Sequence, residues 1–136
     1  MTRRSTAGRL RCSIAGIGIR SFGSDPALAG KLGAAMIRGM QRNGVHACAK
    51  HFPGKGAAAV DAHVELPTIR LSEKELRERH LKPFADAIAA GVSAVMSSHV
   101  LFPALDKKPA TFSPRITRSL LRETLGFSGC VISDDL

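Results

Sequence analysis

The stretch SEKELRERHLKPFADAIAAGVSAVMSSH, residues 72–99, contains one complete helix–strand unit and sets the expectation for the whole chain. Ser72 and Glu75 have the spacing of a capping box, which predicts that a helix begins there. Apolar side chains then recur every three or four positions until Gly91, a residue typical of helix ends. The short apolar run at residues 92–96 follows and is typical of a buried strand.

The same pattern occurs once before and once after this unit. Asp25, followed by a proline, predicts the start of a helix that precedes an apolar strand at residues 45–49. Ser113, also followed by a proline, predicts a helix that precedes a strand at residues 130–132. A glycine separates helix from strand each time, so the chain reads as three consecutive helix–strand units.

Helices that alternate with continuously apolar strands predict an α/β fold with a parallel sheet. The carboxyl ends of parallel strands lie on one side of a sheet, where ligands bind in such folds. Polar residues directly follow each predicted strand, and we expect them to share one rim: Lys50, His51, Ser97, Ser98, His99, Ser133, Asp134 and Asp135.

Composition and cysteine content restrict the class of protein. The chain has 136 residues and 44% apolar content, which fits one globular domain with a core, and no apolar run is long enough to span a membrane. Its three cysteines, Cys12, Cys48 and Cys130, have no metal-site spacing. We expect them to be reduced core residues of a cytoplasmic protein.

The net charge of +9 raises the alternative of a basic module that binds a polyanion such as nucleic acid. Four arginines fall within the first eleven residues, and most other basic residues alternate with glutamates, as in KELRERHLK at residues 74–82. A solvated helix face explains that alternation, so we expect no nucleic-acid partner. The polyanion alternative predicts binding that weakens steeply with salt.

Two carboxylic acids on the expected rim match the chemistry of glycoside hydrolysis, which uses one group at the anomeric carbon and another to protonate the leaving oxygen. Asp134 directly follows a strand, a rigid position suited to a nucleophile. Asp61 lies two residues before His63 on an alanine-rich loop and could orient the imidazole as proton donor and later base. Lys50 and His51 could bind sugar hydroxyls.

Each cluster also has a purely structural explanation. His99 after a strand is more often a hydrogen-bonded structural residue than a catalyst, and residues 133–135 could cap a following helix. Lys50 and His51 could be a surface pair, and the loop around Asp61 could be merely exposed. A metal site built from Asp61, His63 and His51 is a further alternative, although the ligand spacing does not support it.

Four segments carry a resemblance to a known family: RSFGSDP at residues 20–26, KHFPGKG at 50–56, VDAH at 60–63 and LLRETLGFSGCVISDDL at 120–136. In this order they resemble the N-terminal catalytic domain of glycoside hydrolase family 3, in its β-N-acetylglucosaminidase branch. The resemblance covers residues 17–136 and leaves a basic tract at residues 1–16.

The resemblance implies a (β/α)8 TIM barrel that removes terminal N-acetylglucosamine from glycans such as peptidoglycan fragments in the cytoplasm, without a cofactor or metal. It implies that Asp134 is the nucleophile of a retaining reaction and that His63, paired with Asp61, is the general acid/base. Arg20, Lys50 and His51 match positions that bind the sugar. β-Glucosidases of the family use a glutamate from elsewhere, so the Asp61-Ala62-His63 loop favours the N-acetylglucosaminidase branch.

Some features depart from the family pattern. Lys55 stands where KHFPGHG has a histidine, and a TIM barrel needs about 250 residues, so residues 17–136 are expected to form only about the middle half of one, with parallel strands. A catalytically inactive remnant is therefore the main alternative. The open strand edges of a partial barrel would also allow copies of the chain to associate.

Overall fold

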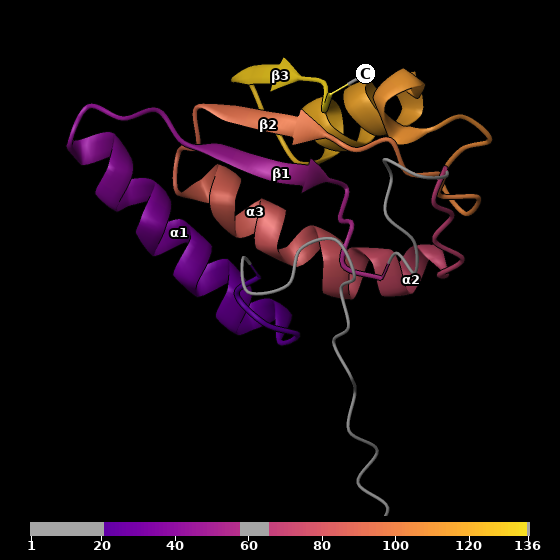
Figure 1. Cartoon of the computed structure of the whole chain (residues 1–136), viewed down its shortest axis with the longest axis horizontal. Helices are drawn as coiled ribbons and strands as arrows, with labels where there is room; N and C mark the ends of the chain where they lie inside the picture. Colours follow the sequence, from indigo (N-terminus) through magenta and orange to yellow (C-terminus); the bar gives the residue numbers. More distant parts are fainter. Residues whose placement is uncertain (1–20, 58–65, 136) are drawn as a thin grey trace, which may run out of the picture.

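The computed structural model describes residues 21–57 and 66–135, and its centre is a three-stranded parallel sheet. The strands are β1 (Cys48–Phe52), β2 (Ala94–Ser97) and β3 (Cys130–Ile132), and their order in the sheet is β1-β2-β3. All three arrows point the same way in Figure 1. The predicted α/β class with parallel strands is confirmed.

The helical segments fill the connections between the strands. They are α1 (Pro26–Arg42), α2 (Glu73–Glu75), the π-helical η2 (Leu76–Leu81), α3 (Lys82–Ala89), the short 3-10 turn η3 (Ala110–Phe112) and the π-helical η4 (Arg115–Thr124). Segments α2, η2 and α3 follow one another without a break, in place of the single α-helix that the sequence predicts. In the described residues, no helix is both long and apolar enough to cross a bilayer.

The helix starts use the caps that the sequence predicts. The Asp25 carboxylate accepts hydrogen bonds from the backbone N–H groups of Ala27 and Leu28 at 2.8 and 3.1 Å. Ser72 and Glu75 form the reciprocal capping box. These side chains satisfy backbone donors that have no partner within the helix, which is why the helices begin at these positions.

The two faces of the sheet differ in what covers them. Ala49, Val95 and Val131 are adjacent in the register and lie in or against the hydrophobic core. The helices supply the rest of that core, with Ile37 from α1, Phe84 from α3 and other residues from η4. The helical layer therefore covers one face, the arrangement of one sector of a β/α barrel.

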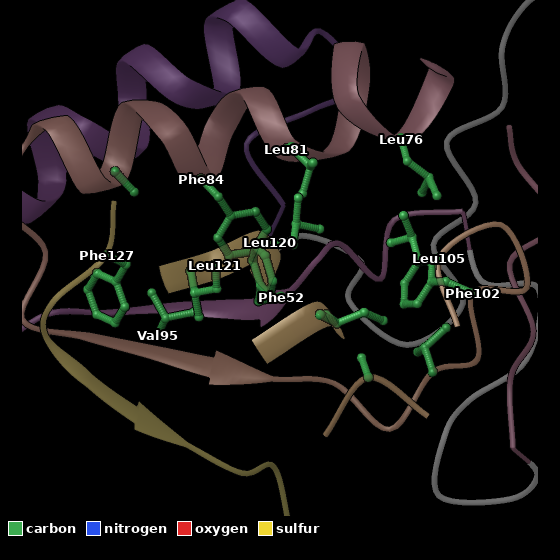
Figure 2. Packing of buried hydrophobic residues seen from close by; sticks show 14 of the residues in the cluster. Phe52, Leu76, Leu81, Phe84, Val95, Phe102, Leu105, Leu120, Leu121 and Phe127 are labelled. Atoms are coloured by element: carbon green, nitrogen blue, oxygen red, sulfur yellow. The ribbon is translucent and has the colours of Figure 1, made fainter. Parts of the chain in front are cut away.

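Figure 2 shows how tightly this core holds the end of β1. Phe52 is fully buried and meets Phe84 of α3 edge to face, with ring centroids 5.1 Å apart and planes at 89°. Leu120 and Leu121 of η4 and Val95 of β2 pack around the same point. The core therefore fixes the carboxyl end of β1, where the candidate site begins.

Two strand predictions are displaced along the chain. The first strand is Cys48–Phe52 instead of residues 45–49, and the second is Ala94–Ser97 instead of 92–96. Val45 is half exposed and belongs to the turn after α1, where its N–H donates to the Met40 carbonyl. Apolar character alone does not separate a strand from the turn before it; pairing with β2 decides where β1 begins.

The prediction that the cysteines are core residues is wrong for Cys48 and Cys130. Both are free thiols and both are exposed. They flank Ala94 in one row of the register, on the face opposite the helices. Strand residues alternate between faces, so a short apolar run does not show which of its members point into the core. Cys12 lies outside the described residues.

Candidate functional site

The candidate site lies at the carboxyl end of the sheet and joins its two outer strands. The His51 side chain, from β1, approaches the Asp134 carboxylate, which follows β3, with Nε2 and Oδ2 3.5 Å apart. Their side chains are 10% and 17% exposed, so both are largely shielded but remain accessible. The structure thus brings together two residues that lie 83 positions apart in the sequence.

His51 lies where the pairing between β1 and β2 is irregular. The Lys50–His51 and Phe52–Pro53 peptide bonds are cis, and the register between β1 and β2 shifts between Lys50 and Phe52. The Phe52 carbonyl accepts a hydrogen bond from the Ser98 N–H at 2.9 Å. His51 therefore sits in a segment anchored to both the sheet and the core.

Lys50 lies within β1, although the sequence places it after the strand. It pairs in register with Met96, which in turn pairs with Ile132, and these three residues form one row across the sheet. Lys50 is exposed, and the row lies on the face that the helices do not cover. Lys50 is therefore an exposed basic residue of the uncovered face and directly precedes His51 in β1.

His99 is hydrogen-bonded within the fold. Its Nε2 lies 2.8 Å from the backbone oxygen of Asp135, and because that oxygen only accepts, Nε2 must carry the proton. The His99 ring also stacks on Phe112, with centroids 6.4 Å apart. His99 thus ties the segment that carries Asp134 to the loop after β2.

Ser97 makes a second tie at the same rim. Its hydroxyl lies 3.0 Å from that of Thr111 and 3.3 Å from the Ile132 carbonyl of β3. Hydrogen bonds from β2 and its following loop thereby support the last residues of β3. The carboxylate of Asp134 is held at a defined place because its neighbours on both sides are tied down.

Three predicted site residues lie outside the described residues. These are Arg20, Asp61 and His63. Of the predicted set, the structure therefore brings together His51 and Asp134 in direct contact, with Lys50 beside them on β1.

Two polar residues near the site were not singled out by sequence reasoning. Lys55, noted only as a departure from the family pattern, is 8% exposed. His80, read from the sequence as part of a solvated helix face, is partly buried and its Nδ1 lies 3.3 Å from the Gly54 carbonyl. A signal for His80 was present: it stands four residues from both Leu76 and Phe84, so it belongs to the apolar stripe of its helix.

The described residues contain no group of three or more His, Cys, Asp or Glu side chains arranged to hold a metal ion. The chemistry of this part of the rim is that of a carboxylate, an imidazole and an ammonium group. A shielded carboxylate with a basic partner can act as a nucleophile or charge stabiliser, and the basic groups can bind hydroxyl groups.

Comparison with known proteins identifies the family of the chain. The family model of the glycosyl hydrolase family 3 N-terminal domain matches residues 11–136. A β-hexosaminidase from Thiobacillus denitrificans is 42% identical over 120 residues, which cover 88% of this chain and 33% of that protein.

Solved structures share the fold. A family 3 β-N-acetylglucosaminidase from a Paenibacillus species superposes with a TM-score of 0.85 at 47% identity, covering 87% of this chain and 23% of that one. NagZ from Neisseria gonorrhoeae superposes with a TM-score of 0.85 at 41% identity, covering 90% of this chain and 36% of that one. NagZ has also been solved with N-trifluoroacetyl-D-glucosamine.

The chain spans about a third of the length of the curated relatives it matches. Its parallel sheet and single helical layer are accordingly part of a TIM barrel, as the sequence predicts. The match to the family model covers far more than half of the chain. The chain belongs to glycosyl hydrolase family 3, as part of its N-terminal domain.

Proposed function

We propose that the protein is a retaining exo-β-N-acetylglucosaminidase that removes terminal N-acetylglucosamine from glycans. Support comes from the family membership and from the names of the relatives, which are β-hexosaminidases and β-N-acetylglucosaminidases. The observation that carries the proposal is the contact between His51 and Asp134 at the carboxyl ends of β1 and β3, the edge where active sites lie in TIM barrels.

In the proposed first step, a carboxylate oxygen of Asp134 attacks the anomeric carbon and the glycosidic bond breaks. His63 gives its proton to the leaving oxygen, and Asp61 stabilises the imidazolium before that transfer. In the second step, His63 removes a proton from water, the water oxygen attacks the anomeric carbon, and the bond to Asp134 breaks. Two displacements return the sugar with its original configuration.

The remaining residues bind and orient the sugar. Lys50, His51 and Arg20 are proposed to hold its hydroxyl groups. Nε2 of His51 lies 3.5 Å from Oδ2 of Asp134, so His51 is also placed to orient the carboxylate for attack. His51 therefore has two proposed tasks, one on the sugar and one on Asp134.

The finer features of the proposal concern the substrate and its place in the cell. N-acetylglucosamine at the end of a peptidoglycan fragment is the proposed substrate, and the cytoplasm is the proposed location. No cofactor or metal takes part in the proposed steps, because the two displacements need only an acid/base and a nucleophile.

The test uses the protein at the length its gene encodes and a chromogenic β-N-acetylglucosaminide. We expect turnover that Asp134→Asn lowers by about three orders of magnitude or more, because the amide cannot act as the nucleophile. Asp86→Asn is the matched control, since it removes the same charge from α3, and it should keep near-normal turnover. Faster hydrolysis of the matching β-glucoside would contradict the assignment to the N-acetylglucosaminidase branch.

The activity of residues 1–136 by themselves is a further question. Within the described residues, β1 and β3 each pair with β2 alone and their outer edges are open. Open edges and an uncovered face favour the alternative that these residues alone are inactive. The same assay on the isolated chain decides it, since robust turnover that Asp134→Asn abolishes would exclude the inactive remnant.

A further inference from the structure

His80 of η2 lies directly beneath the loop that follows β1. Its Nδ1 is 3.3 Å from the backbone carbonyl of Gly54, and Gly54 is three residues from His51. A carbonyl oxygen can only accept, so Nδ1 must carry the proton in this contact. Burial lowers the pKa of His80, so the ring is neutral at neutral pH, with Nε2 free of a proton.

The fit between His80 and Gly54 is too close for any other residue at position 54. A Cβ added to Gly54 would lie 2.6 Å from Nδ1 of His80 and 2.9 Å from its Cβ. Gly54 also has a φ of +132°, a conformation that residues with a Cβ rarely adopt. The loop backbone is therefore packed against this one side chain.

The same helical stretch also contacts the last residue of β1. Phe84 of α3, four residues after His80, meets the fully buried Phe52 edge to face. His80 thus contacts Gly54, and Phe84 contacts Phe52, from the same side of one continuous helical stretch. His51 directly precedes this segment. The helix contacts therefore restrict where the His51 imidazole lies relative to Asp134.

We propose that His80 is a positioning residue of the candidate site, which holds the Gly54 carbonyl and thereby fixes His51 against Asp134. It does not touch the substrate; it acts through the loop. Its kinetic consequences rest on the proposed glycosidase activity, whereas its effect on the loop does not.

The variants His80→Asn and His80→Leu separate the effect of the hydrogen bond to Gly54 from the effect of side-chain packing. Both replacements branch at Cγ and have nearly the same size, so both leave a similar cavity, but only asparagine can donate an N–H from the atom that replaces Nδ1. His46 provides matched controls, as His46→Asn and His46→Leu. It is exposed and contacts Ser93 before β2, at the end of the sheet opposite the site.

The first readout is amide hydrogen exchange at Ser98, whose N–H is bonded to the Phe52 carbonyl. We expect His80→Leu to speed exchange at Ser98 by about tenfold or more, with His80→Asn close to wild type and the Val45 amide unchanged. This measurement needs no activity. Equal exchange at Ser98 in the Asn and Leu variants would overturn the proposal.

The second readout is a double-mutant cycle on the protein at the length its gene encodes. We expect His80→Leu to lower kcat/KM for an N-acetylglucosaminide by about tenfold to a hundredfold, while His80→Asn retains most of it. Added to His51→Ala, His80→Leu should cause little further loss, because it acts through His51. His46→Leu is the control for this cycle. Its small effect on kcat/KM should be the same in wild type and in His51→Ala, because the two sites are independent.

Losses from His80→Leu and His51→Ala that simply multiply would overturn the proposal, because they would show that His80 acts independently of His51. Failure of the wild-type protein to hydrolyse any N-acetylglucosaminide would contradict the proposed function instead. In that case the Ser98 exchange still decides the role of His80.

Discussion

At the scale of single residues, side chains outside the His51–Asp134 pair support the two chain segments that carry this pair. His99 and Ser97 tie the end of β3 to the loop after β2, while Phe84 and His80 hold the end of β1. Nε2 of His51 and Oδ2 of Asp134 lie 3.5 Å apart between these two sets of contacts. Residues outside the His51–Asp134 pair therefore contribute to where the carboxylate and the imidazole lie.

His80 makes the stability of the protein depend on pH. Burial lowers its pKa and the positive charge of the neighbouring Arg79 acts in the same direction, against the opposing effect of the hydrogen bond to Gly54. The unfolded chain takes up the proton near the ordinary value of about 6.5, and the folded protein does so only at lower pH. Between these values the unfolded state binds more protons, so acidification favours unfolding.

We therefore expect the free energy of unfolding to fall as the pH is lowered through about 6.5, and to fall less steeply in His80→Asn, which does not titrate. Denaturant unfolding of both proteins over this pH range measures the difference. Parallel pH profiles would show that the His80 ring titrates equally easily in both states.

Gly54 gives a second test at this scale. Gly54→Ala should lower the free energy of unfolding by about 1–3 kcal/mol more than Gly23→Ala, because only the first meets a neighbouring side chain. Both glycines have positive φ, and nothing lies within 4 Å of a Cβ built at Gly23. Gly23→Ala is therefore the matched control for backbone strain, and equal losses in the two variants would contradict the tight fit at His80.

At the scale of elements, the packing of α1 on α3 depends on a small residue. A Cβ added to Gly30 would lie 2.9 Å from Cγ of Asp86 and 3.2 Å from its Cβ. Gly39 lies in the same helix, and a Cβ there would meet nothing within 4 Å. Gly30 and Gly39 both lie in the α-helix α1 and differ in whether a neighbouring side chain is close.

Alanine at these two positions should have opposite effects. Gly30→Ala is expected to destabilise the protein by about 1–3 kcal/mol, because α1 and α3 must move apart or Asp86 must turn away. Gly39→Ala should stabilise it by about 0.5–1 kcal/mol through the higher helix propensity of alanine. Denaturant unfolding measures both, and a stabilising Gly30→Ala would show that the helices do not touch there.

The elements also show what sequence alone can predict here. The caps at Asp25 and Ser72 involve residues two or three positions apart, so local sequence is enough to place them. The bounds of β1 depend instead on pairing with β2, and that pairing moves Lys50 into the strand. For the same reason the exposure of Cys48 could not be read from its apolar neighbours.

The candidate site divides in the same way. Asp134 and His51 could be expected at one rim because both follow or end parallel strands. The role of His80 could not, because it arises from a contact between a helix and a loop 26 residues away. Its place on the apolar stripe of the helix was the only local sign.

At the scale of the whole molecule, none of the helices in residues 21–57 and 66–135 covers one face of the sheet. This face carries Lys50, Met96 and the 38% exposed Ile132, and in a complete barrel it would point inward. Expressed alone, the 136 residues should therefore associate through this face and the open strand edges. Sedimentation velocity should show oligomers that Ile132→Lys reduces.

Val45→Lys is the control for that measurement. Val45 is 51% exposed and belongs to the turn after α1, at the other end of the sheet. Val45→Lys should leave the association of the chain unchanged. A chain that stays monomeric at high concentration, or that Val45→Lys disperses as well as Ile132→Lys, would contradict association through the open face.

We propose above all that Asp134 is the nucleophile of a retaining N-acetylglucosaminidase. The most direct measurement is mass spectrometry of the gene-length protein after reaction with a 5-fluoro N-acetylglucosaminyl fluoride, which slows the second displacement and lets the glycosyl-enzyme accumulate. We predict one added sugar, located on Asp134 after proteolysis and absent from Asp134→Asn. An adduct on a different residue, or steady turnover with no adduct on Asp134, would contradict the account.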